Sequence, residues 1–183
     1  MDYYTDFFGI KYPFRKYDQL FVPEFNSGAM ENVGCVTFNE SYINRGETFP
    51  QVDKENLGTT ITHELAHMWF GNLITMKWWD DLWLNESFAT FMSHMCLEFA
   101  TGLEDYTMSW EMFNGDKRWG MRTDMYASTH PIACDCKDTE DADRIFDGIS
   151  YGKGASFLKQ LIHYIGENAF RKGIQHYFQT YQW

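Results

Sequence analysis

Apolar and polar residues alternate over short stretches near the start of the chain and recur at helical spacing over the rest. A short helix is expected at residues 2–8, ended by Gly9, followed by β-rich runs at 19–23 and 33–38 with a turn between them. From residue 53 onward, apolar residues recur every three or four positions, as on one face of a helix. The pattern predicts an α+β chain forming a single domain over residues 1–183, with a β-rich part at 1–52 and a mainly helical part at 53–183.

The helical part is expected to hold five helices, with ends marked by glycines and aspartates. Asp53 could cap the first helix, which ends at Gly71, and Asp80 or Asp81 starts the second. The expected helices cover 53–71, 80–102, 104–125 and two stretches after Gly154 that are separated at Gly166. The acidic stretch at 135–143 is expected to be an exposed loop.

Composition narrows the classes of partner and compartment. Hydrophobic residues make up 44% and aromatic residues 19% of the chain, which indicates a packed core. The formal net charge of −11 argues against a nucleic-acid partner or an anionic membrane. No apolar run is long enough to span a membrane, and the first residues do not have the pattern of a signal peptide. The four cysteines are interpreted as free thiols, which favours a cytoplasmic location and leaves open an ectodomain of a membrane-anchored form.

The strongest candidate for chemistry is the run His63-Glu64-Leu65-Ala66-His67. Two histidines four residues apart lie on one face of a helix, so both imidazoles can reach one metal ion. Glu64 would lie beside the metal, where it can accept a proton from water. A catalytic zinc needs a third protein ligand, and Glu86, separated from His67 by eighteen residues, is the candidate. The motif alone also occurs by chance in unrelated chains.

From their local sequence alone, the other candidate residues are interpreted as structural and not functional. Glu31, in Gly28-Ala29-Met30-Glu31-Asn32, is by local sequence a solvated carboxylate at a strand end, and Tyr151 is a buried aromatic. The remaining histidines have no partner at ligand spacing. They are expected to be loop, packing or surface residues: His94, His130, His163 and His176.

Four blocks of sequence together resemble the M1 family of zinc aminopeptidases. They are GAMEN at 28–32, HELAHMWFGN at 63–72, WWDDLWLNESFATFM at 78–92 and FDGISYGKGASFL at 146–158. Their wording is most similar to the puromycin-sensitive and bacterial aminopeptidase N-like branches. The resemblance covers nearly the whole chain and implies a thermolysin-like zincin catalytic domain.

The resemblance also implies a role for each catalytic position. His63, His67 and Glu86 would bind one Zn²⁺ per chain. Glu64 would be the general base, and Tyr151 would donate its hydroxyl to the oxyanion that forms from the scissile carbonyl. The partners of the two histidine rings stay open, with Asp80, Asp81 and Asn85 nearby in sequence.

The GAMEN block implies a substrate with a free N-terminus. Glu31 would bind the α-amino group of the peptide, which favours an aminopeptidase over an endopeptidase. Gly28 and Ala29 would present backbone to a substrate lying along this edge as an added strand, and Met30 and Asn32 belong to the same substrate-binding segment.

Family members are much longer than 183 residues, so we expect N- and C-terminal domains of a longer protein to be missing from this chain. An alternative function is therefore an inactive fragment that binds zinc or peptides. An epoxide hydrolase activity, found in one branch of the family, is disfavoured because Phe146 stands where that branch has tyrosine. The side-chain preference of the enzyme is not predicted.

Overall fold

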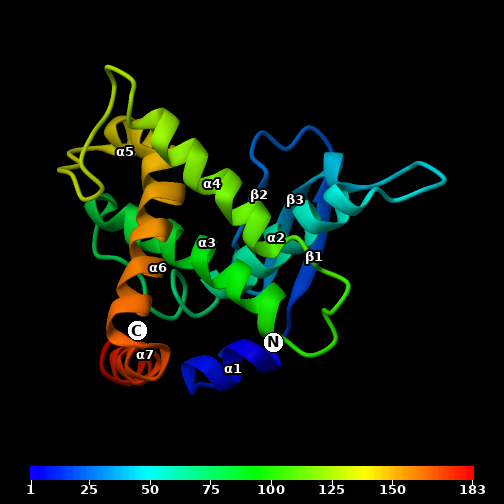
Figure 1. Ribbon diagram of the computed structural model, residues 1–183, viewed down its shortest axis with the longest axis horizontal. Coiled ribbons are helices and arrows are strands. Elements are labelled where there is room, and N and C mark those ends of the chain that lie inside the picture. The colour runs from blue at the N-terminus through cyan, green and yellow to red at the C-terminus, as the bar shows by residue number, and fades with distance from the viewer.

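A small mixed sheet lies beside a larger group of helices in the computed structural model, which describes residues 1–183 (Figure 1). Helix α1 (Asp2–Phe8) is followed by strands β1 (Asp18–Val22), β2 (Ala29–Met30) and β3 (Cys35–Asn39). The strand order is β1-β3-β2, with β3 parallel to β1 and antiparallel to β2. The two-residue strand β2 pairs only with β3, so its other edge is open to a further strand.

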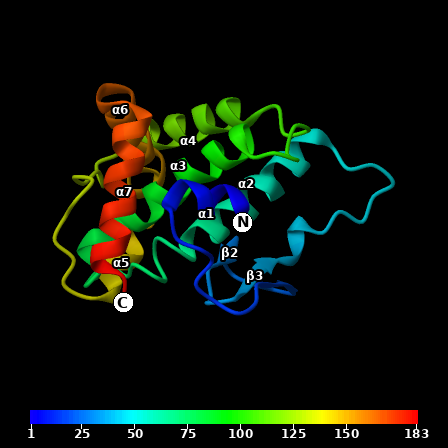
Figure 2. The ribbon, with the colours of Figure 1, turned by 90° about the horizontal axis from the view of Figure 1, so that it is seen from below.

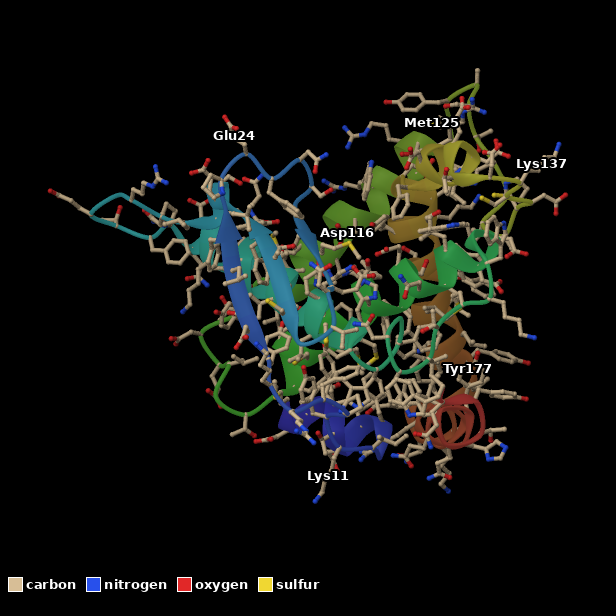
Figure 3. The ribbon with its side chains drawn as sticks, turned by 180° about the vertical axis from the view of Figure 1, so that it is seen from behind. Lys11, Glu24, Asp116, Met125, Lys137 and Tyr177 are labelled. Atoms are coloured by element: carbon tan, nitrogen blue, oxygen red, sulfur yellow. The ribbon has the colours of Figure 1, made fainter.

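The remainder of the chain is helical, which confirms the predicted α+β class. The α-helices are α2 (Gln51–His67), α3 (Leu82–Phe99), α4 (Ser109–Thr123), α5 (Thr139–Ile145), α6 (Gly154–Ile165) and α7 (Glu167–Tyr181). A single π-helical turn, η3 (Ile149–Lys153), leads into α6. Seen from behind, Glu24 on the sheet side and Lys137 on the helical side lie far apart (Figure 3). None of the helices combines the length and the apolar character needed to cross a bilayer.

Helix α3 is the centre of the packing. Thirteen of its eighteen residues are buried, so neighbours cover it on nearly every side. Phe88 and Met92 of α3 join a core that also contains Trp69, from the turn after α2, and Tyr4 and Phe8 of α1. Helix α1 in turn lies against α7 below this core, where Gln175 Nε2 donates to Phe7 O at 2.9 Å (Figure 2).

The boundaries of α2 differ from those expected. The helix begins at Gln51 after Pro50, and no side chain caps it, so the predicted Asp53 cap is wrong. It ends at His67 instead of Gly71. Gly71 is still required where the chain turns under His67. Its φ is 135°, a conformation that favours glycine, and a Cβ added to it would lie only 2.7 Å from Asn85 Oδ1.

Helix α4 begins at Ser109 and not at Glu104, because a buried carboxylate accepts hydrogen bonds from the backbone amides just before Ser109. Glu55 is fully buried in α2, and its Oε1 accepts from the amides of Thr107 at 2.8 Å and Met108 at 3.1 Å. Gln51 Nε2 donates to the same oxygen at 2.8 Å. The loop before α4 is thus fixed on α2 by contacts more than fifty residues apart in sequence, which local patterns do not reveal.

The expected exposed loop at 135–143 is wrong in its second half, where α5 forms. Asp138 caps this helix by accepting from the amide of Asp141 at 2.9 Å. Ala142 and Ile145 are buried on its inner face. The helix was not predicted because the stretch is mostly acidic and only two of the helix residues, Ala142 and Ile145, are buried apolar residues.

Substitution Glu55→Ala is expected to destabilise the chain, because it removes the acceptor of the Thr107 and Met108 amides and of Gln51 Nε2. Each hydrogen bond contributes about 0.5–1.5 kcal/mol. Urea denaturation should show a lower midpoint at an unchanged m-value. Glu47→Ala, in an exposed loop, is the matched control and should leave the midpoint where it is. Equal midpoints for the two variants would contradict the anchoring role of Glu55.

Candidate metal and peptide site

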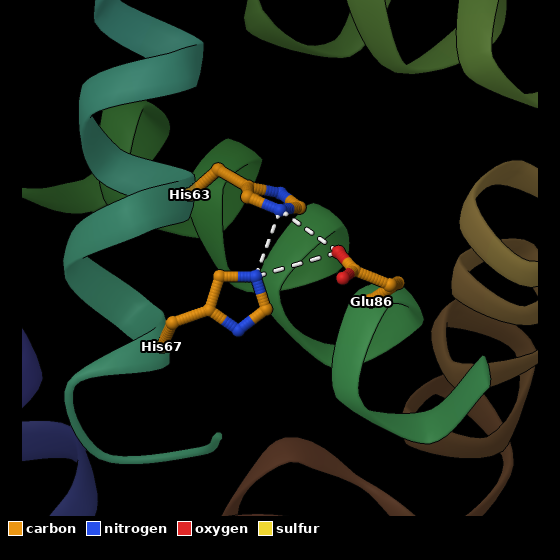
Figure 4. Close-up of side chains that lie close together, drawn as sticks. All are labelled: His63, His67 and Glu86. Atoms are coloured by element: carbon orange, nitrogen blue, oxygen red, sulfur yellow. Dashed lines mark hydrogen bonds and ion pairs between the residues drawn. The ribbon is translucent and has the colours of Figure 1, made fainter. Parts of the chain in front are cut away.

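Helices α2 and α3 bring three ligand atoms together at one point. His63 and His67 are one turn apart on α2, and Glu86 lies in the second turn of α3 (Figure 4). The two histidine Nε2 atoms are 3.0 Å apart. Glu86 Oε2 lies 3.2 Å from Nε2 of His63 and 3.4 Å from Nε2 of His67. The three residues that the motif predicted as ligands therefore converge.

The distances fit a tetrahedral zinc ion. Zinc bonds to histidine nitrogen and carboxylate oxygen at about 2.0–2.2 Å, so two ligand atoms of a tetrahedral site lie roughly 3.3 Å apart. The three observed separations, 3.0, 3.2 and 3.4 Å, fall around this value. Three protein ligands would leave one coordination position open, as in catalytic rather than structural zinc sites.

Contacts on the far side of each imidazole orient the rings. His67 Nδ1 donates to the Phe70 carbonyl at 3.1 Å, and His63 Nδ1 lies 3.4 Å from Thr90 Oγ1. Such contacts keep both Nε2 atoms available to a metal. Of the nearby candidates in sequence, Asn85 reaches the site, but it contacts Glu86 at 3.5 Å and not a histidine. No sequence pattern reveals these partners, because one is a backbone carbonyl and the other comes from α3.

Burial and close charges shift the pKa values of the site. Burial would raise the pKa of Glu86, but the two histidines outweigh it and hold that pKa well below its usual range. Burial would lower the pKa of His67, but the carboxylates of Glu31 and Glu86 raise it to about 10. Two carboxylates thus stabilise positive charge at His67, as they would at a metal ion in the same place.

Glu64 is a second buried acid beside the two histidines. Burial, opposed by the two histidines, raises its pKa to about 7. Its Oε2 atom is buried without a hydrogen-bond partner in the protein. Glu64 also forms, with Glu31 and His67, a second group whose ligand atoms lie within 4.8 Å of one another. A free carboxylate oxygen beside the metal ligands is the arrangement that a proton acceptor requires.

The GAMEN segment borders the metal ligands at Glu31. Glu31 Oε1 is 3.9 Å from His67 Nδ1, and the Glu31 side chain is only 16% exposed, so the local expectation of a solvated carboxylate is wrong. Asn72, five residues after His67, donates from Nδ2 to the Glu31 carbonyl at 2.8 Å. This contact fixes the segment against the turn after α2, and no sequence pattern signals it.

The other GAMEN residues have separate positions. Ala29 and Met30 form β2, and Met30 is exposed. The Gly28 carbonyl accepts a hydrogen bond from the Asn39 amide at 2.8 Å, so it is bonded to the end of β3. Asn32 Nδ2 donates to Thr37 Oγ1 at 3.1 Å, which directs its side chain toward β3. Glu31 is thus the member of the segment whose side chain reaches the metal ligands.

Tyr151, on the π-helical turn η3, completes the group. Its ring lies parallel to the His63 imidazole, with ring centroids 6.0 Å apart and planes at 13°. Burial, with the Glu86 carboxylate adding to it, raises the pKa of Tyr151 well above its usual range. The phenol therefore keeps its proton and can donate a hydrogen bond.

Two histidines outside this group each pair with an aspartate. His94 is fully buried and its Nε2 lies 2.9 Å from Asp116 Oδ2, so it joins α3 to α4 as a packing residue. His130, expected to be a loop histidine, lies in a loop but contacts Asp147 at 3.0 Å.

Comparison with known proteins agrees with the geometry. The chain is 52% identical over 98% of its length to an aminopeptidase N of Streptomyces lividans, and 45% identical over its full length to a probable aminopeptidase 2 of Sulfurisphaera tokodaii. It is 43% identical to a tricorn protease-interacting factor F2 of Thermoplasma acidophilum, again over its full length. It spans only 21–23% of the length of these relatives.

The family model "Peptidase family M1 domain" matches residues 1–183. Members of this family are zinc enzymes, and their catalytic domains are of the zincin kind. Since the match covers every residue, the chain belongs to peptidase family M1.

Proposed function

We propose that this chain carries the catalytic centre of a zinc aminopeptidase that hydrolyses the N-terminal peptide bond of peptides. The observation that carries the proposal is the convergence of His63, His67 and Glu86 within 3.4 Å, next to the unpartnered oxygen of Glu64. When bound, zinc would supply a Lewis acid for the scissile carbonyl and lower the pKa of its water from 15.7 to about 7.

In this proposal the protein residues handle protons and the growing charge. Glu64 accepts a proton from the attacking water at Oε2 and delivers it to the leaving amine. Its burial keeps bulk water from competing for that oxygen. Tyr151 donates its hydroxyl to the oxygen that becomes negative in the tetrahedral intermediate, which is where such donors act most strongly.

Glu31 would supply the preference for a free N-terminus. Asn72 bonds the backbone carbonyl of Glu31, and the Glu31 carboxylate lies 3.9 Å from His67 Nδ1. An α-ammonium bound by this carboxylate would place the first peptide bond near the proposed metal ligands. A peptide chain could add to the open edge of β2, with its backbone bonded to that strand. Internal segments of a peptide carry no ammonium and would leave Glu31 unpaired, at an energetic cost.

Zinc binding tests the ligand set in the 183-residue chain itself. Wild-type chain is expected to keep about one zinc per molecule after dialysis, and His63→Ala is expected to lose it. Zinc at 100 times its dissociation constant should raise the free energy of unfolding by about 2.7 kcal/mol in the wild type and not in the variant. His176→Ala, an exposed histidine, is the control. Equal zinc content in all three proteins would rule out His63 as a ligand.

The role of Glu64 is tested by Glu64→Gln in a protein that contains residues 1–183. Bound zinc should be unchanged, while kcat for aminoacyl amides falls about 10²–10⁴-fold because the proton acceptor is gone. Glu47→Gln controls for loss of a surface charge. An unchanged kcat would refute the proposed mechanism. One equivalent of zinc without turnover in the unsubstituted chain would favour the alternative of a zinc- or peptide-binding fragment.

The role of Glu31 is tested by the choice between substrates with free and acetylated N-termini. Glu31→Ala should lower kcat/KM for the free amine about 10- to 100-fold, as expected for losing a charged hydrogen bond. The acetylated peptide should be unaffected, so the preference shrinks. If the preference stays at its wild-type value, another group binds the amine.

A further inference from the structure

The tyrosine over the metal ligands sits on an unusual piece of backbone. Tyr151 is the middle residue of η3, a π-helical turn between Gly148 and α6. Such turns are rare, and they are common at functional sites because they redirect a side chain within a helix. What fixes the start of this turn therefore decides where the Tyr151 hydroxyl points.

Asp147 fixes the start of the turn with its side chain and its backbone. Its Oδ1 accepts from the amides of Ile149 at 2.8 Å and Ser150 at 3.2 Å. Its carbonyl accepts from the amide of Tyr151 itself at 3.1 Å. Three consecutive amides leading to the tyrosine thus end on one residue.

His130 holds the other oxygen of the same carboxylate. Its Nε2 lies 3.0 Å from Asp147 Oδ2, and its Nδ1 donates to the Pro131 carbonyl at 2.7 Å. Both side chains are largely covered, with 15% of His130 and 21% of Asp147 exposed. The histidine is thereby held at both ring nitrogens and restricts rotation of the carboxylate.

The rest of the turn has little freedom, because glycines press it against α4. A Cβ on Gly152 would lie 2.0 Å from the Asp116 carbonyl oxygen, and one on Gly148 would lie 2.8 Å from that of Trp119. On the other side of the turn, the Ser150 carbonyl accepts a hydrogen bond from Ser87 Oγ at 2.5 Å. Ser87 directly follows Glu86, the proposed metal ligand, on α3. A small change at Asp147 therefore cannot be absorbed elsewhere in the turn and must move Tyr151.

We propose that Asp147, held by His130, is a positioning residue that sets the orientation of Tyr151 over the metal ligands. This inference rests on the proposed function for the role of Tyr151, but the placement itself is a property of the chain. A carboxylate at the start of a helix also adds stability, so the test has to separate placement of the tyrosine from stability.

Fluorine NMR of the 183-residue chain labelled with 3-fluorotyrosine reports the placement without metal or turnover. The Tyr151 resonance is assigned as the one that Tyr151→Phe removes. We expect Asp147→Ala to move this line toward the value of free fluorotyrosine, and His130→Gln to move it part of the way. Asp135→Asn removes an exposed carboxylate from the same region and should leave the line in place.

An unmoved Tyr151 line in folded Asp147→Ala protein would overturn the proposal. Folding is judged from the remaining tyrosine lines. If Asp147→Ala does not fold, Asp147→Asn decides, because it keeps an oxygen for the two amides and loses the charge facing His130. A Tyr151 line in Asp147→Asn that coincides with the wild-type line, together with an unmoved line in His130→Gln, would equally reject the pair as a positioning device.

A double-mutant cycle on kcat then separates this inference from the proposed function. Asp147→Ala should lower kcat by up to about 10²-fold, the effect of a displacement near 1 Å, with KM little changed. In a Tyr151→Phe background the same substitution should change kcat by less than about 2-fold. Full additivity would reject the positioning role while the proposed function stands. No effect of Tyr151→Phe on an active enzyme would instead remove the proposed role of Tyr151 and leave the NMR result valid.

Discussion

Three ionisable side chains meet between α2 and α3, and the rest of the structure depends on keeping them there. Buried charges are tolerated only when each is paired, so His63, His67 and Glu86 need one another or a cation in the same position. The two helices must also stay in register. Tyr4 helps to hold that register, because its hydroxyl lies 2.8 Å from the Thr62 carbonyl of α2 and 3.1 Å from the Met92 carbonyl of α3.

The residue proposed to bind the substrate amine is attached to this helix pair from a different part of the chain. Glu31 comes from the edge of the sheet, and Asn72 comes from the turn that follows α2. That turn exists because Gly71 adopts a backbone conformation and an approach to Asn85 that a side chain would prevent. One glycine thus links the end of α2 to the residue proposed to recognise the substrate amine.

The candidate metal ligands could be predicted from sequence because helical geometry is local. A spacing of four puts His63 and His67 on one face of a helix whatever the fold around them, and Glu86, separated from His67 by eighteen residues, was the candidate third ligand. The family blocks added roles for Glu31 and Tyr151. Features that depend on distant contacts could not be found in this way. The start of α4 is set by Glu55, which is 52 residues before Thr107 in the sequence. The residues that contact the histidine rings, Phe70 and Thr90, lie outside the His63–His67 motif and cannot be read from it.

The π-helical turn shows why a local pattern can be correct about a residue and silent about its placement. The apolar spacing of α6 requires Ala155 and Leu158 to face the core, and both are buried. Gly154 must also face α3, since a Cβ there would lie 1.9 Å from Ser87 Oγ. A continuous α-helix through residues 149–158 would fix the direction of Tyr151 by the same period. The wider turn adds one residue to the hydrogen-bonded ring, which frees Tyr151 to face His63 while α6 keeps its packing.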